Sequence, residues 1–218
     1  MRQAPFPWDD ADPAIRSKIA DNLVTVRHAV LRSAKQRDPF SLQLVRDWHV
    51  QSLAGVPLGE PGLAGKFRGE GLAGSKLSTS RVRVGSFEGT NPQDIVTELS
   101  TLVTDVTTRL EALDSQYPPG VLLDHKGQEE VVDLCAMIHG EWIRIHPFAN
   151  GNGSTARLLA NWVAVRYGLP AFVMVKPRPD SMTGYPVAAE MSMRRNHRFL
   201  KRIFVQMLDE ERRRLSSS

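Results

Sequence analysis

The sequence predicts an all-α fold with one small β-hairpin. Apolar residues recur every three or four positions along most of the chain, which is the spacing of amphipathic helices. A glycine-dense stretch, 55–91, breaks this pattern and carries a strand-like alternation instead. The 218 residues, of which 41% are hydrophobic and 24% charged, are enough for one sizeable core. We therefore expect a helical bundle with a short hairpin.

Two helices are expected near the N-terminus. Asp12 and Pro13 suit the N-cap and the first position of a helix over 13–35, whose apolar residues keep helical spacing. Ser41 suits the N-cap of a second helix over 41–54.

The stretch 55–91 is interpreted as a long loop that contains a small hairpin. Loops of this length in a compact domain usually carry function. An alternation of arginine and valine inside it suits a short exposed strand, formed by Arg81, Val82, Arg83 and Val84.

Further helices are expected over about 92–113, 127–145, 153–167 and 195–214. The helix over 127–145 is strongly apolar and contains the single cysteine, Cys135, which we interpret as core packing. One cysteine excludes an internal disulfide and favours a reducing compartment. Since no apolar run resembles a signal peptide or a membrane span, a cytoplasmic location is expected.

The chain is basic, with a net charge of +4 and a pI near 9.5. Many of the cations lie within 194–214, and such a cluster can attract nucleic acid. Acidic residues interrupt the cluster, and no base-reading motif accompanies it. We favour a solvated helix face and expect neither nucleic acid nor a membrane as partner.

Residues 150–157 have the composition of an anion site at the start of a helix. Gly151 and Gly153 flank Asn152, so backbone N–H groups can converge with the exposed N–H groups of the next helix. Arg157 lies about one turn into that helix and can point back to clamp a phosphate. The side-chain amide of Asn152 can donate to the same place.

His146 ends the preceding apolar helix and faces this turn. A neutral imidazole there can accept a proton from a hydroxyl that attacks phosphorus. Pro147 ends the helix, and Phe148 anchors the loop in the core. These parts suit nucleotidyl or phosphoryl transfer, in which catalysis is mostly positioning and charge stabilisation.

The spacing His-Pro-Phe-x-x-Gly-Asn-Gly-x-x-x-Arg, over 146–157, resembles the signature of the Fic/Doc family. Upstream, the run Ala64 to Arg68, followed by Val82-x-Val84-Gly85, resembles the stretch that leads into the family's flap, a hairpin that docks the target. The resemblance covers about residues 40–205 and implies a Fic-like helical bundle. It divides the chain into an N-terminal helical extension, 1–36, and a Fic domain, 37–218, with the flap at about 64–91.

The resemblance implies a protein adenylyltransferase that moves AMP from ATP to a hydroxyl side chain of a target protein. His146 is then the catalytic base. The flap residues Arg81, Val82, Arg83 and Val84 pair with the target as an added strand. Mg²⁺ accompanies the ATP, with Asn150 as its protein ligand. The nucleotide is held by Asn150, Gly151, Asn152, Gly153, Ser154 and Arg157.

Two positions depart from the family pattern. The family generally has Asp or Glu at Asn150 and Arg at Ser154, so a metal-binding charge and a phosphate-binding cation are both missing. Losing one charge-assisted bond costs about 1.5–3 kcal/mol, which in a transition state slows the rate by roughly one to two orders of magnitude. A phosphotransferase of the same family and a catalytically degenerate binding module therefore stay open as alternatives.

A possible inhibitory segment lies in the first helix, because an inhibitory partner or helix accompanies many members of the family. Ser17 to Asn22 has the spacing of that family motif, with Asp21 in place of Glu. In the family this carboxylate pairs with the arginine equivalent to Arg157. We favour a plain helix, since so short a pattern recurs by chance.

Overall fold

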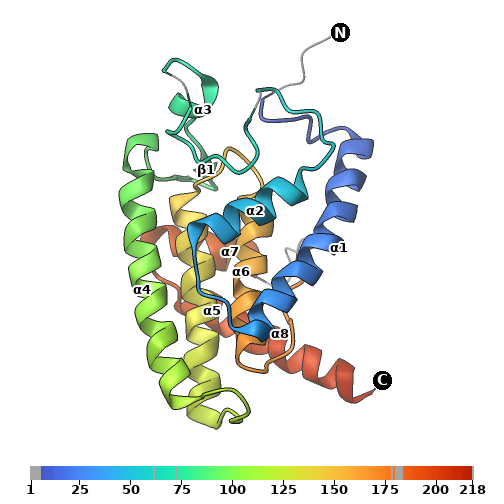
Figure 1. The fold of residues 1–218 in the computed structure, drawn as a ribbon, viewed down its shortest axis with the longest axis vertical. Helices are drawn as coiled ribbons and strands as arrows, with labels where there is room; N and C mark the ends of the chain where they lie inside the picture. Colours follow the sequence, from blue (N-terminus) through green and yellow to red (C-terminus); the bar gives the residue numbers. More distant parts are fainter. Residues whose placement is uncertain (1–5, 61, 72, 178, 180–183, 218) are drawn as a thin grey trace.

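The computed structural model describes residues 6–217 except 61, 72, 178 and 180–183 (Figure 1). The all-α prediction is confirmed: helices form the body, and the strands of the described part make one two-stranded sheet. In this part of the chain no helix is long and apolar enough to cross a membrane.

The centre of the bundle is α5, His125–Ile145. It packs against α4 (Ile95–Gln116), α6 (Asn152–Arg166) and α8 (Arg198–Ser216), which surround it in Figure 1. From Val131 onward almost every side chain of α5 is buried, because helices cover it on several sides. The predicted core role of Cys135 is confirmed, since its side chain is fully buried.

The first two helices run along one side of the bundle. α1, Pro13–Gln36, packs on α6 and on α2, Leu42–Ser52. Both predicted N-caps form: a carboxylate oxygen of Asp12 and the hydroxyl of Ser41 each accept a backbone N–H of the first turn. α1 contributes to the main hydrophobic core. The division at residue 36 stays a prediction.

A small hairpin follows the short helix α3, Lys76–Thr79. β1, Arg83–Val84, pairs antiparallel with β2, Phe87–Glu88. Gly85 takes a φ of 57° in the connecting turn, a left-handed conformation that favours glycine. The strand is shorter than the arginine–valine alternation suggested, although Gly89 N still donates to Val82 O at 3.0 Å.

A 3₁₀ turn, η1 at Pro92–Asp94, precedes α4 where the sequence predicted the start of the helix.

The last third of the chain differs most from the sequence prediction. The unpredicted α7, Tyr185–Met191, is followed by the 3₁₀ turn η3, Ser192–Arg194. The final helix begins at residue 198 rather than 195, because Arg195 takes a φ of 56° that ends η3. α7 is too short to show a helical period in the sequence.

Candidate functional site

The backbone of His146 leaves the helix at the end of α5. Its φ of 52° and ψ of 56° turn the chain into the left-handed region. The ring atom Nδ1 lies 3.1 Å from Ile143 O. Since a carbonyl only accepts, Nδ1 carries the proton in a neutral ring, and Nε2 keeps a lone pair.

The surroundings of His146 keep the ring neutral. Burial lowers the pKa of His146 from 6.5 to about 4. The bond to Ile143 O offsets part of this effect, whereas the charge of Arg68 adds to it. Near neutral pH the imidazole is therefore a proton acceptor at Nε2, which a general base requires.

The loop after His146 leads into an open helix start. Gly151 takes a φ of 83° and stands as the N-cap of α6, which has no side-chain cap hydrogen bond. The first N–H groups of an α-helix have no intrahelical acceptor, and here they stay available for an anion. A side chain at Gly151 would also approach His49, whose Nε2 would lie 3.2 Å from the new Cβ.

His49 fastens this loop to the rest of the bundle. Its ring stacks on Phe148 with the centroids 3.7 Å apart. Gly65 N donates to Nδ1 at 2.9 Å, so Nε2 carries the proton and donates to Asn150 O at 3.2 Å. Burial lowers the pKa of His49 to about 4.

The Asn152 side chain has a different role from the one predicted. It is 1% exposed, its Oδ1 accepts Phe148 N at 3.0 Å, and its Nδ2 donates to Phe148 O at 2.8 Å. The amide therefore fixes the loop from inside, and only the backbone N–H of Asn152 is left to serve an anion. The sequence could not show this, because the side chain can point either way from the same position.

Arg157 is buried, with 4% of its surface exposed. Its Nε and Nη2 donate to Val175 O at 3.2 and 3.1 Å, and Nη1 lies 3.4 Å from the Tyr185 hydroxyl. Nη2 also lies 3.5 Å from Ser154 Oγ. The guanidinium is thus held in the wall of the site. Asp21 is exposed, and none of the bonds found for Arg157 in the described residues goes to it.

Asn150 meets a carboxylate from the N-terminal segment. Its Oδ1 accepts Gly151 N at 2.7 Å, and its Nδ2 donates to Asp10 Oδ2 at 2.6 Å. Trp8 Nε1 donates to the other oxygen of Asp10 at 2.6 Å. The predicted metal ligand therefore has its amide oxygen engaged, and an acidic oxygen lies directly beside it.

These groups line one cavity of about 670 Å³. His146, the 150–154 loop and Arg157 form part of it, and Arg83 and Val84 of the hairpin close another side. Cationic side chains outnumber acidic ones in the lining: Arg16, Arg83, Arg157 and Lys176 against Asp10 and Glu190. This excess suits a polyanion.

The hairpin tip is fastened to α7. Ser86 donates to Glu190 Oε1 through both its backbone N and its Oγ, each at 3.0 Å. A Cβ at Gly85 would lie 2.3 Å from the same oxygen and would be strained at a φ of 57°, so any other residue would have to shift the Glu190 side chain. A second contact joins the hairpin to η3: the guanidinium of Arg194 lies over the ring of Phe87 in β2, 4.9 Å from the ring centroid.

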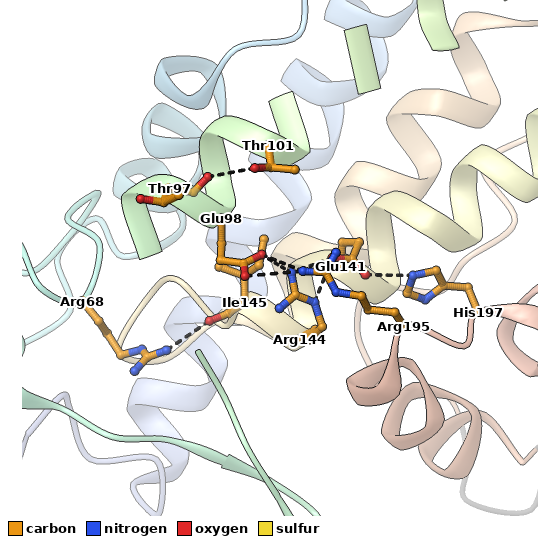
Figure 2. A network of polar contacts seen from close by, with 9 residues as sticks. All are labelled: Arg68, Thr97, Glu98, Thr101, Glu141, Arg144, Ile145, Arg195 and His197. Carbon is orange, nitrogen blue, oxygen red and sulfur yellow. Dashed lines mark hydrogen bonds and ion pairs between the residues drawn. The ribbon is translucent and has the colours of Figure 1, made fainter. Parts of the chain in front are cut away.

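An ion-pair network braces the end of α5 just before His146 (Figure 2). Arg144 pairs with Glu98 of α4 and with Glu141 of its own helix. Arg195 pairs with Glu98 at 3.0 Å, and His197 Nε2 lies 2.9 Å from Glu141 Oε1. The network joins α4, α5 and the start of α8 beside the site.

Comparison with known proteins identifies the arrangement. A sequence model described as the Fic/DOC family matches residues 39–164, more than half of the chain. The chain belongs to the Fic/DOC family.

Relatives that share this Fic domain are named protein adenylyltransferases. The chain is 25% identical over 156 residues to protein adenylyltransferase fic-1 of Caenorhabditis elegans, covering 71% of this chain and 25% of the relative. It is 37% identical over 79 residues to protein adenylyltransferase Fic of Aedes aegypti, covering 36% of this chain and 16% of that one. The chain thus spans about a quarter or less of these relatives.

Solved structures share the fold. A Fic domain containing signaling protein from Bacteroides thetaiotaomicron superposes with a TM-score of 0.62 at 19% identity, over 88% of this chain and 70% of that one. Fic-1 of C. elegans gives 0.54 at 22% identity, over 88% and 50%.

The Fic site gathers most of the residues that the sequence singled out. His146, Arg83, Val84, Arg157 and the 150–154 loop share the cavity, whereas Arg81 and Val82 lie at the base of the hairpin, outside its lining. Sequence reasoning missed Asp10 and Glu190. No motif marks them, since each contacts its partner in the site across more than a hundred residues of sequence.

Proposed function

We propose that this chain transfers AMP from ATP to a hydroxyl of a target protein. One observation carries the proposal: the lone pair of His146 Nε2 and the open N-terminus of α6 belong to the same cation-rich cavity. A neutral base beside an anion site is the minimum that hydroxyl attack on phosphorus requires.

The reaction follows from the residues present. The N–H groups at the start of α6 and the Arg157 guanidinium hold the phosphates of ATP. His146 Nε2 accepts the proton of the attacking hydroxyl while its oxygen bonds to the α-phosphorus. The bond between the α-phosphorus and the bridging oxygen breaks, pyrophosphate leaves, and the proton on His146 passes to solvent or product.

Mg²⁺ would neutralise phosphate charge when it is bound with ATP. The cavity fits such an ion at one corner, where the Asp10 carboxylate lies beside Asn150. Asp10 would be the charged protein ligand and Asn150 its neighbour. Among the described residues no group of three acidic, histidine or cysteine side chains could hold a metal ion by itself, so most ligands of this ion would have to come from the nucleotide and water.

The hairpin is the proposed docking site for the target. It is a two-stranded sheet in the described structure, so an edge is free to pair with an extended segment. Because β1 lines the cavity that contains His146, a segment on this edge would present its hydroxyl to Nε2.

Cys135, the one cysteine of the chain, is buried and forms no disulfide, which supports action in a reducing compartment such as the cytoplasm.

The test uses ATP labelled at the α- or the γ-phosphate with a cell lysate. Label from α-ATP alone, lost in His146→Ala, is the expected result. Label from γ-ATP alone would establish phosphotransfer instead. Calorimetry with ATP and Mg²⁺ identifies the third alternative: a protein that binds no nucleotide, even with Ser154→Arg and Asn150→Asp, is a binding module.

A further inference from the structure

Arg68 is a fully buried cation held by carbonyl groups. Its side chain is 1% exposed, and no ion pair of Arg68 is found among the described residues. Burial lowers the pKa of Arg68 to about 10. Buried charges are normally paired with an opposite charge, so what the guanidinium binds instead indicates its role.

The carbonyls come from three separate segments. Nε donates to His146 O at 2.8 Å, and Nη2 donates to Ile145 O at 3.1 Å, the contact drawn in Figure 2. Nη1 donates to Ser80 O and Nη2 to Thr90 O, both at 2.8 Å. Ser80 and Thr90 lie just before and just after the hairpin, so one side chain ties both of its ends to the backbone of the proposed base.

Neighbouring backbone contacts strengthen this junction. Arg68 N donates to Pro147 O at 2.7 Å, and Thr90 N lies 3.4 Å from Arg144 O. Gly89 fits against the site so closely that a Cβ there would lie 3.2 Å from the Cβ of His146 and 3.6 Å from Arg68 Nη2. The base of the hairpin therefore packs directly on His146.

We propose that Arg68 is a positioning residue that locks the hairpin to the backbone of His146 and so fixes the distance between the docked target and the base. The proposal rests on the proposed function of both elements. Only arginine suits the position, because its planar fork carries five N–H donors, whereas lysine offers one ammonium. A fixed spacing keeps the target hydroxyl aligned, and a misplacement of about 1 Å costs on the order of 10²-fold in rate.

A first experiment needs no variant. Hydrogen exchange by NMR compares Arg68 Nε–H with the amides of Gly89 and Thr90. A lock predicts that all three exchange through one common opening event. Much weaker protection at the amides of the hairpin base than at Arg68 Nε–H, each relative to its own rate in an unfolded chain, would overturn the proposal. The hairpin would then move while Arg68 stays bound.

The second experiment compares Arg68→Lys, Arg68→Gln and the matched control Arg46→Gln. Arg46 holds the same loop through Gly65 O and Glu70 but contacts neither His146 nor the hairpin. Both Arg68 variants should lose exchange protection at Gly89 and Thr90 and lower kcat for the target by about 10- to 100-fold. ATP affinity, set by the 150–153 loop, should stay within about threefold. The control should keep hairpin protection and kcat.

The titration of His146 by NMR separates charge from geometry. Arg68→Gln removes a cation and should raise the pKa of His146 above about 4, whereas Arg68→Lys should leave it low. The other charged groups that line the cavity are the same in all variants: Asp10, Arg16, Arg83, Arg157, Lys176 and Glu190.

The outcomes are distinguishable from those of the proposed function. Wild-type protein that transfers no AMP refutes the proposed function, while the exchange and titration measurements still test the lock. If Arg68→Lys folds, keeps hairpin protection and retains full kcat, Arg68 is not a positioning residue. Should neither Arg68 variant fold, the exchange measurement on the wild-type protein decides.

Discussion

The two ends of the candidate site are built in different ways. The anion end, residues 150–157, is a continuous segment whose turn and helix start follow from its own glycines. The target end is a hairpin that owes its position to two residues outside it. Arg68, from the preceding loop, holds its base, and Glu190, from α7, holds its tip. Nucleotide binding should therefore respond mainly to changes in the 150–157 segment and in the few residues that contact it, such as Asp10 and His49. Target docking should respond to changes at the residues that hold the hairpin.

The largest effect is expected for Gly151→Val at the anion end. A β-branched residue at a φ of 83° is strained by roughly 1–2 kcal/mol, and its Cβ would press on His49. The loop must then rearrange and lose its phosphate-facing N–H groups, which lowers ATP affinity on the order of 10²-fold. Calorimetry measures this; target binding to the hairpin should be unchanged. Equal losses of both would show that the two ends are not independent.

Acid should loosen the attachment of the anion end through His49, which bridges Gly65 and Asn150. Its pKa is about 4 in the folded protein and 6.5 in an unfolded chain, so the folded state resists protonation. The contribution of His49 to the free energy of unfolding is fully present above about pH 6.5. It is lost as the pH falls towards 4, which lowers the free energy of unfolding by roughly 3 kcal/mol. Urea unfolding at several pH values checks this. His49→Asn should remove only the share of the slope that His49 contributes, because the lowered pKa values of His146 and His139 act in the same pH range. His28→Asn, on the exposed face of α1, should leave the slope unchanged.

Asp10→Asn tests whether a carboxylate from the N-terminal segment completes the anion end. We expect Mg²⁺-dependent ATP affinity to fall about tenfold, because the charged oxygen beside Asn150 is lost. Adding Asn150→Asp should restore it by returning a carboxylate to the same corner. Calorimetric titrations with and without Mg²⁺ measure both changes. An unchanged Mg²⁺ dependence would remove Asp10 from the site.

The smallest effect is expected for Glu190→Gln at the hairpin tip. The carboxylate that accepts two bonds from Ser86 becomes a neutral amide, so the tip is held less firmly. KM for the target should rise a few-fold while ATP affinity stays the same. Glu211→Gln, a surface change on α8 remote from the hairpin, serves as control. A change in ATP affinity alone would contradict the division between the two ends.

Local sequence predicted the elements better than their contacts. The caps at Asp12 and Ser41 and the turn at Gly151 were predictable because each depends on a few adjacent residues. The short α7 was not predictable, since fewer than two turns show no clear period. Nor was the start of the last helix at residue 198, which depends on the left-handed backbone of Arg195.

The sequence by itself determined the bundle, the anion turn and the identity of the proposed base, because each is written in neighbouring residues or in a fixed motif spacing. Only the tertiary structure decided that Asn152 turns inward, that Asp10 meets Asn150, and that Arg68 joins the hairpin to His146. The contacts of Asp10 and Arg68 join residues far apart in the chain. The direction of the Asn152 side chain, which bonds to nearby Phe148, depends on packing that no local pattern records.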